Sequence, residues 1–130
     1  MRILVCGSRE WKDKEAIKLA IIEECNRSKQ PSPMHVYIIN GAARGADELS
    51  SEVAEELGLM LQEFPAAWGC HGRAAGPIRN AEMLRTKPDV VLAFWDGKSK
   101  GTKNMIKQAQ DAKVRTRIFK YSWGIVKEVG

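Results

Sequence analysis

Short apolar runs rich in β-branched residues alternate along the chain with longer stretches in which apolar residues recur every three or four positions. The short runs are typical of buried strands, and the longer stretches have the period of amphipathic helices. Parallel strands of one sheet are joined by helical crossovers, so this alternation indicates repeated β-α units. The sequence therefore predicts an α/β fold with a mostly parallel sheet.

The clearest predicted strand is Asp89–Phe94, which is almost continuously apolar, as expected of a central strand that helices cover on both faces. The other predicted strands are residues 3–6, 36–39, 59–64 and 114–120, the last as an edge strand followed by a short tail at 121–130. We expect a single Rossmann-like, doubly wound domain over residues 1–130, with about five strands.

Four stretches between these runs are predicted to be helices, each with an apolar stripe that faces the sheet. The stripes are Ile17, Ala20, Ile21 and Cys25 in a helix over about 13–27; Leu49, Val53 and Leu57; Ile78, Ala81 and Leu84; and Met105, Ile106, Ala109 and Ala112. Gly58 ends the second helix, Pro77 suits the first turn of the third, and Thr102 is the expected N-cap of the fourth. Pro31 and Pro33 mark a loop.

Cysteine content and hydropathy bear on the compartment of the protein. The chain has three cysteines, an odd number without CxxC spacing, which argues against a disulfide framework and against a structural zinc site. Its apolar runs fall far short of the ~20 residues that span a bilayer, and the run behind Arg2 is too brief for the core of a signal peptide. We therefore expect a cytoplasmic protein that contacts no membrane and holds no metal or cofactor.

Glycine-containing polar loops follow three of the predicted strands, at Gly7–Arg9, Gly41–Asp47 and Asp96–Thr102. The carboxyl ends of parallel strands meet at one edge of a sheet, so these loops are expected to converge where helices begin. Glycine lets backbone N–H groups approach an anion, and a helix N-terminus carries partial positive charge. One such glycine alone is most simply a turn residue, but three loops together favour a phosphate site.

Cations accompany these loops and flank the segment behind the third predicted strand. They are Arg9, Arg44, Lys98, Lys100, Arg73 and Arg79. Guanidinium groups pair with phosphate through two hydrogen bonds, so we ascribe much of the net charge of +5 to cations around a small anionic ligand. The residues expected to bind the ligand are Gly7, Ser8, Arg9, Gly41, Ala42, Arg44, Gly45, Asp47, His71, Arg73, Arg79, Asn80, Gly97, Lys100, Gly101 and Thr102.

No GxGxxG follows the first predicted strand and no GxxxxGK[ST] run occurs, so dehydrogenase and P-loop interpretations lose their main support. The segments Gly7–Trp11, Gly41–Asp47, Phe64–Trp68, His71–Asn80 and Gly101–Thr102 instead resemble the YspA-like branch of the SLOG superfamily, which unites Smf/DprA proteins with the Lonely Guy phosphoribohydrolases. The resemblance implies a nucleotide-binding domain, in some relatives a cytokinin-activating hydrolase and in others a sensor of NAD-derived or cyclic nucleotides. Relatives commonly self-associate, so a homo-oligomer is expected.

The signature of the hydrolase branch resembles Pro-Gly-Gly-x-Gly-Thr-x-x-Glu, with a catalytic final glutamate. Gly101–Thr102 aligns with this signature, and Met105 stands at the glutamate position. The arginine that accompanies the glutamate is closest to Arg79. If the chain is an enzyme, the resemblance leaves Asp96 or Asp47 to replace the missing acid beside Arg79. Asp47 is explained equally well as a helix N-cap.

His71 lies in a predicted irregular segment, residues 68–73, and is a candidate general acid or adenine contact, although a lone loop histidine is more often a simple hydrogen-bonding residue. Cys70 lies beside it, but adjacent residues do not build a tetrahedral metal site, and His35 is expected in mid-strand. Trp68 and Trp95 are candidates for stacking on a base, whereas Trp11 and Trp123 are expected to be packing residues.

The favoured hypothesis is a sensor or sequestering protein for a nucleotide or nucleotide-derived ligand, such as an ADP-ribose-like or cyclic species. One alternative is hydrolysis of a nucleotide N-glycosidic bond, as in Lonely Guy enzymes, and a second is binding of single-stranded DNA, as in Smf/DprA relatives. DNA binding requires an extended basic groove with interleaved aromatic residues. The one basic cluster outside the loops is interpreted as a solvated edge strand, so weak or no nucleic-acid binding is expected. It comprises Lys113, Arg115, Arg117 and Lys120.

Overall fold

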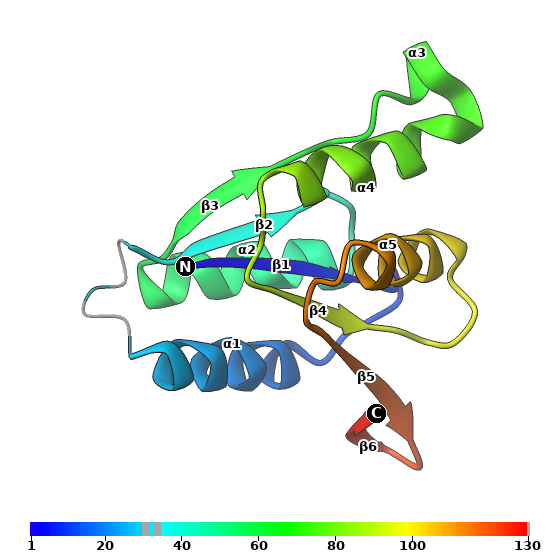
Figure 1. Cartoon of the computed structure of the whole chain (residues 1–130). Coiled ribbons are helices and arrows are strands. Elements are labelled where there is room, and N and C mark those ends of the chain that lie inside the picture. The colour runs from blue at the N-terminus through cyan, green and yellow to red at the C-terminus, as the bar shows by residue number, and fades with distance from the viewer. Residues whose placement is uncertain (30–31, 33–34, 130) are drawn as a thin grey trace.

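A computed structural model shows a sheet enclosed between two pairs of helices (Figure 1). It describes residues 1–29, 32 and 35–129. The strands are β1 (Arg2–Gly7), β2 (Tyr37–Asn40), β3 (Met60–Glu63), β4 (Val90–Phe94), β5 (Thr116–Ser122) and β6 (Ile125–Val129). The helices are α1 (Lys14–Ser28), α2 (Ala46–Leu57), α3 (Trp68–His71), the 3₁₀ turn η2 (Gly72–Ala74), α4 (Ala75–Arg85) and α5 (Lys100–Asp111). The predicted α/β, Rossmann-like fold is confirmed.

The six strands lie in the order β3-β2-β1-β4-β5-β6. Neighbouring strands pair in parallel except β5 and β6, which form an antiparallel hairpin. The chain builds outward from β1 to β3 in one direction and from β4 to β6 in the other, so the strand order reverses between β1 and β4. At such a reversal the following loops leave the sheet toward opposite faces and open a crevice at the carboxyl ends of the strands.

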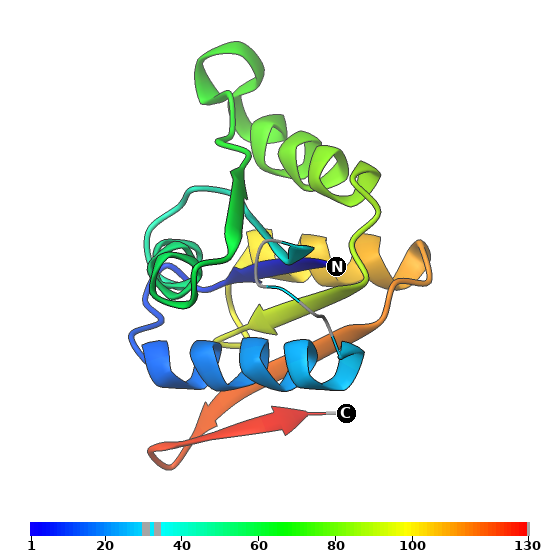
Figure 2. The same ribbon diagram turned by 90° about the vertical axis from the view of Figure 1, so that its left-hand side faces the viewer.

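Alternate side chains of the central strands enter two separate cores. On β1, Ile3 and Val5 pack with α1 and α2, whereas Leu4 and Cys6 pack with α4 and α5. Figure 2 shows the same helices from the side. All five residues of β4 are buried, as predicted for a central strand covered on both faces.

The first helix begins one residue later than predicted, because Asp13 caps it: its Oδ1 accepts a hydrogen bond of 3.0 Å from the backbone N–H of Ala16. Its buried stripe ends at Glu24, and Cys25 is only half-buried. Burial of this carboxylate is compensated by the guanidinium groups of Arg115, directly before β5, and of Arg117 in β5, which approach it to 2.6 and 2.8 Å.

The prediction that the last strand is an edge strand was wrong, as was the prediction of a tail at 121–130. Residues 125–129 form a sixth strand, β6, which covers the outer side of β5. The chain reverses at Trp123 and Gly124, whose φ angles of 55° and 75° are typical of a type I′ hairpin turn. A type I′ turn favours Asn or Asp before the glycine. Because tryptophan stands at this position, the sequence did not indicate a hairpin.

The helices on the other face also differ in detail from the prediction. The segment predicted as irregular forms α3 and η2. In α4 the buried positions include Asn80 and Met83, whereas Ile78, Ala81 and Leu84 are half-buried. The register is shifted because Asn80 faces α5, where its Nδ2 donates to the carbonyl oxygen of Gly101.

Thr102 is not the N-cap of α5, because the helix already begins at Lys100 and Ser99 takes the cap position. Ala112 lies exposed behind the end of this helix, and His35 lies before β2 rather than inside it. The predicted loop prolines, Pro31 and Pro33, fall outside the described residues. Within the described ranges, no helix is long and apolar enough to cross a membrane.

Candidate functional site

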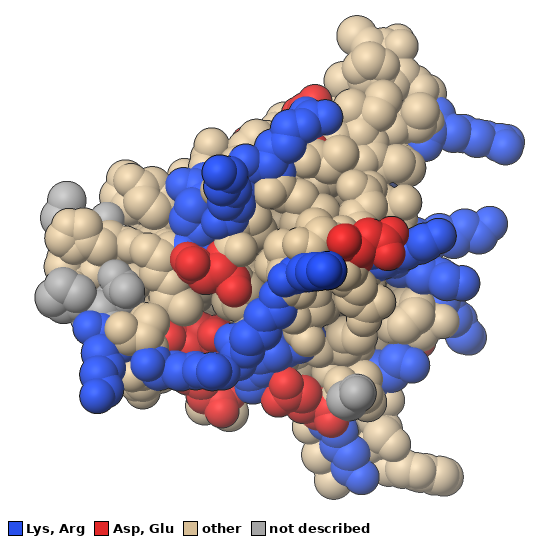
Figure 3. Space-filling view, viewed as in Figure 1, with Lys and Arg blue, Asp and Glu red and all other residues tan. Residues whose placement is uncertain are grey.

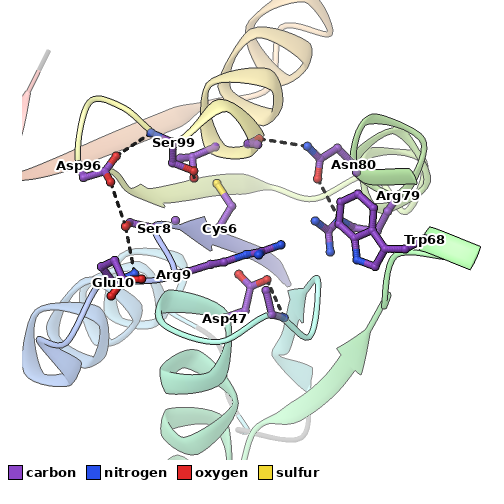
Figure 4. A pocket seen from close by; sticks show the side chains of 15 residues that line it. Cys6, Ser8, Arg9, Glu10, Asp47, Trp68, Arg79, Asn80, Asp96 and Ser99 are labelled. Carbon is purple, nitrogen blue, oxygen red and sulfur yellow. Dashed lines mark hydrogen bonds between the residues drawn. The ribbon is translucent and has the colours of Figure 1, made fainter. Parts of the chain in front are cut away.

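A pocket of about 320 Å³ occupies the crevice at the carboxyl ends of β1 and β4 (Figure 4). Its walls come from the loops behind β1, β2 and β4 and from the α3–α4 segment. The residues that line it are Cys6, Gly7, Ser8, Arg9, Glu10, Ala43, Asp47, Trp68, Gly76, Arg79, Asn80, Asp96, Ser99, Gly101 and Thr102. Residues far apart in the sequence therefore meet in the crevice formed where the strand order reverses.

Nine of the predicted site residues line this pocket: Gly7, Ser8, Arg9, Asp47, Arg79, Asn80, Asp96, Gly101 and Thr102. Gly41, Ala42 and Arg44 instead line an adjoining depression of about 370 Å³. The side chain of Arg44 is 69% exposed and pairs with Glu10 at 3.1 Å, so the structure does not direct it into the main pocket.

Five predicted residues line neither cavity: Gly45, His71, Arg73, Gly97 and Lys100. His71 and Arg73 are exposed on the α3–η2 segment, which projects from the body of the protein (Figure 1). Lys100 is exposed at the start of α5. The sequence placed His71, Arg73 and Lys100 near the pocket loops but did not predict the directions of their side chains.

Gly45 allows the loop after β2 to pack closely against the loop after β1. Its φ of 78° lies in the left-handed region, and a Cβ there would collide with the carbonyl oxygens of Ser8 and Arg9. The backbone N–H of Ala46 donates to the Ser8 carbonyl at 3.1 Å. The N-terminus of α2 is therefore closed by the loop behind β1 rather than open to an anion, contrary to the expectation from the glycine pattern.

Asn40, which the sequence analysis missed, organises the loop behind β2. Its buried Nδ2 donates to Asp47, Ser50 and Ser51, and its Oδ1 accepts the backbone N–H of Ala42 at 2.9 Å. These bonds hold Ala42 at a φ of 57°, an uncommon conformation for a residue with a Cβ. A polar residue at the end of an apolar strand was the signal for this role.

Asp47 does not cap α2. It is the second residue of that helix, and its Oδ2 accepts the backbone N–H groups of Gly41 and Ala43 at 3.1 and 3.3 Å. Its Oδ1 has no hydrogen-bond partner among the described residues. Burial raises the pKa of this carboxyl to about 6, although the N–H of Ala43 and the charge of Arg79 act in the opposite direction.

Two arginines bring positive charge to the pocket. Arg79 is anchored through Nη1 to the carbonyl oxygen of Gly41 at 2.7 Å and through Nε to Asn80 at 3.1 Å, while its Nη2 has no acceptor among the described residues. Gly41 makes room for it, because a Cβ there would collide with the guanidinium group. Arg9 extends across the pocket in Figure 4. The site can therefore stabilise an anion from two sides.

The first turn of α5 forms another wall of the pocket through Gly101 and Thr102. The first N–H groups of a helix have no acceptor inside it and lie at the positive end of the helix dipole. A Cβ at Gly101 would meet nothing within 4 Å, so the space beside this residue is open.

Asp96 is held by its own loop. Its Oδ1 accepts the N–H groups of Lys98 and Ser99 at 2.8 Å, and its Oδ2 accepts the hydroxyl of Ser8 at 3.2 Å. The N–H groups of Ser99 and Lys98 lower the pKa of this carboxyl, so it is ionised near neutral pH. It can accept hydrogen bonds but is a weak proton donor.

Cys6 is a lining residue that the sequence analysis placed only in a buried strand. Its thiol pKa is raised by burial and, to a smaller degree, by Asp47. It is therefore an unreactive thiol rather than a nucleophile. Met105, at the position of the hydrolase glutamate, is buried in the core with Met83 and does not line the pocket. Among the described residues, no group of three His, Cys, Asp or Glu is arranged to hold a metal ion.

The fold and the pocket define the class: a Rossmann-like protein with a polar, arginine-containing pocket at a reversal of strand order. The chain belongs to the YspA, cpYpsA-related SLOG family, whose model matches residues 1–71. It is 38% identical over 116 residues to the Gene 61 protein of Mycobacterium phage D29. The matched region covers 85% of this chain and 90% of the phage protein. Membership of this family points to nucleotide-related binding or processing.

Proposed function

We propose that this protein binds a phosphorylated nucleotide, or a small molecule derived from one, in the pocket at the carboxyl ends of β1 and β4. The observation that carries the proposal is the arrangement of Arg79. Its Nη1 is fixed to the Gly41 carbonyl, so the guanidinium group is positioned before any ligand arrives, and Nη2 remains available to an anion. A prepositioned guanidinium loses little entropy on binding phosphate.

Two further features support a phosphate at this position. Arg9 supplies a second cation from the opposite wall, and the first turn of α5 presents N–H groups at Gly101 and Thr102. Asp47 lines the same pocket, is influenced by the charges of both arginines, and has one carboxyl oxygen without a partner among the described residues. When protonated, this carboxyl donates a hydrogen bond to a phosphate oxygen.

The proposal includes a role as a sensor or sequestering protein in the cytoplasm, and an ADP-ribose-like or cyclic nucleotide as the type of ligand. The free cysteines Cys6, Cys25 and Cys70 are compatible with a reducing compartment. Self-association is proposed from the family resemblance alone.

A second candidate function is release of the base from a nucleotide, and Asp47 is the observation that favours it. General acid–base catalysis is most efficient when the pKa of the group is near the working pH, and the buried Asp47 has a pKa of about 6. Asp96 suits this role less well, because both of its oxygens are engaged and its pKa is lowered.

The test of the proposed function is calorimetric titration with AMP, ribose 5-phosphate and adenosine. We expect AMP and ribose 5-phosphate to bind and adenosine to bind much more weakly. Arg9→Ala should weaken AMP binding by about tenfold or more, whereas the matched control Arg73→Ala, at an exposed arginine that lines neither cavity, should change it little. Equal affinity for adenosine and AMP would contradict the proposal.

A further inference from the structure

A second cavity of about 190 Å³ adjoins the pocket on the side of β5. We call it the aromatic annex, and its lining residues are Ser8, Glu10, Trp11, Trp95, Asp96, Lys120 and Tyr121. Ser8, Glu10 and Asp96 also line the main pocket, so the two cavities meet along these three residues. The last part of the chain thus contributes to a site that otherwise belongs to its first and central parts.

The rings of the annex have their polar groups turned to the protein. The indole N–H of Trp11 donates to the Asp13 carbonyl at 2.9 Å, that of Trp95 donates to the Ser99 carbonyl at 3.0 Å, and the Tyr121 hydroxyl donates to the Asp13 carboxylate at 3.0 Å. Trp11 and Tyr121 also pack together, with ring centroids 5.1 Å apart. Trp11 is itself buried, so the ring surface that a ligand can reach belongs to Trp95 and Tyr121. Such surface, without unmet hydrogen bonds, suits a flat heterocycle.

Lys120 supplies the polar contact that a heterocycle needs. Its Nζ lies 4.9 Å from the centroid of the Trp95 ring, and it has no carboxylate partner among the described residues. An ammonium group held over an indole keeps its N–H donors available. The ring nitrogen and exocyclic oxygen atoms of a nucleobase are acceptors for such donors.

The junction of the two cavities carries negative charge. Asp96 is oriented by Ser8, and Glu10 has only an exposed ion pair with Arg44, which contributes little. Carboxylates repel phosphate but accept hydrogen bonds from hydroxyl groups, as acidic residues do for ribose in other nucleotide sites. From the arginines to the annex, the surface therefore changes from cationic to anionic to aromatic, which matches the order phosphate, ribose and base.

We propose that the aromatic annex is the base subsite of the pocket, with the ribose hydroxyls at Glu10 and Asp96 and the phosphate at Arg9 and Arg79. This inference rests on the proposed function and adds the direction in which the nucleotide lies. Trp68, at the opposite end of the pocket in Figure 4, is then not the residue that stacks on the base.

The test compares AMP with ribose 5-phosphate, which lacks the base, on three variants of the full chain. Tyr121→Leu and Lys120→Ala alter the annex, and Trp123→Ala is the matched control, because Trp123 lies on the same hairpin but is 97% exposed and outside the annex. Loss of a stacked base costs roughly 5- to 100-fold in affinity. We expect a loss of about tenfold for AMP in Tyr121→Leu, a smaller loss in Lys120→Ala, no change in Trp123→Ala, and unchanged ribose 5-phosphate binding in all three.

Indole N–H resonances of the four tryptophans give an independent reading, because each reports one position in the fold. AMP should shift the Trp95 resonance more than ribose 5-phosphate does. Unchanged AMP affinity in Tyr121→Leu and Lys120→Ala, or a ring-specific shift at Trp68 instead of Trp95, would overturn the base subsite while leaving the phosphate site intact. Failure of the wild type to bind both ligands would instead contradict the proposed function itself.

Discussion

The guanidinium group of Arg79 on α4 and the carbonyl oxygen of Gly41 behind β2 are joined by a hydrogen bond of 2.7 Å. The bond links the loop after β2 to α4, the helix that connects β3 with β4. It also fixes the orientation of the cation that faces the pocket. The ligand site therefore depends on the packing of α4 against this loop.

Replacement of Arg79 by Lys should weaken the binding of AMP and of ribose 5-phosphate by roughly 10- to 100-fold. A charge-assisted hydrogen bond contributes roughly 1.5–3 kcal/mol, and lysine cannot donate to Gly41 and a phosphate with the same planar geometry. Calorimetry provides the measurement. Arg85→Lys, at an exposed position on the same helix, is the control. An unchanged dissociation constant for Arg79→Lys would remove this residue from the site.

Binding of AMP should weaken as the pH rises from about 5 to about 7.5, and it should do so more in the wild type than in Asp47→Asn. The Asp47 carboxyl ionises with a pKa of about 6, and its negative charge then opposes the phosphate. The expected excess loss is about tenfold, as for a shift of one pKa unit on binding. The comparison cancels the titration of the phosphate itself. Parallel pH profiles for the two proteins would rule out a contact with Asp47.

Thermal stability gives a test of the Asp47 pKa that needs no ligand. Because the folded-state pKa of about 6 lies above the ordinary value of 3.8, the folded chain binds the proton more tightly than the unfolded chain between these values. The contribution of this group to the free energy of unfolding therefore falls as the pH rises from about 4 to about 6. The melting temperature of the wild type, relative to that of Asp47→Asn, should fall over this range and level off above it; a constant difference would contradict the raised pKa.

Release of adenine from AMP by the wild type should be very slow or absent. The hydrolase branch that the sequence resembles uses a glutamate where this chain has the buried Met105. Loss of general acid–base assistance lowers the reaction rate by about 10²–10⁴-fold. Chromatography of the products measures the rate. Any residual release should disappear in Asp47→Asn and persist in Met105→Leu. Rapid release that depends on Asp96 would contradict the choice of Asp47.

Binding to single-stranded DNA should be weak and should fade at physiological salt. Arg115 and Arg117, the arginines of the basic cluster at residues 113–120, are engaged by Glu24 and, for Arg117, by Glu128 at 2.9 Å. On the face shown in Figure 3, Lys and Arg form several groups interrupted by Asp and Glu. Few phosphates are therefore neutralised together. Fluorescence anisotropy with a labelled oligonucleotide tests this, and submicromolar binding at physiological salt would contradict it.

The central strands and the two-sided helical cover could be predicted from the sequence because β4 is apolar at every position and β1 nearly so. The β5–β6 hairpin could not, because its turn places tryptophan where such turns usually carry Asn or Asp. The predicted stripe of α1 is buried at Ile17, Ala20 and Ile21. Pattern alone missed Glu24 of α1 and Asn80 of α4, which are buried because they have polar partners on other elements.

For the pocket, the sequence located the loops but not the directions of their side chains. Arg9 and Arg44 both lie in glycine-containing loops that follow strands, yet only Arg9 lines the main pocket, because the side chain of Arg44 is exposed and pairs with Glu10. Cys6 was missed because it ends the apolar strand predicted at residues 3–6 and resembles a core position, and Asn40 was missed because it directly follows the strand predicted at residues 36–39. The sequence left two roles for Asp47, a helix N-cap and a ligand contact. The fold shows instead that its carboxylate accepts a hydrogen bond from the preceding loop.

The reversal of strand order between β1 and β4 also determines how long one edge of β1 stays unpaired while the chain is being synthesised. Until residues 90–94 have emerged, β1 pairs only with β2, and its other edge has no partner. That edge exposes the backbone of a strand whose Ile3, Leu4 and Val5 are completely buried in the finished protein. A bare apolar strand edge invites pairing between unfinished chains. Insertion of β4 therefore opens the ligand crevice and removes an aggregation hazard in the same event.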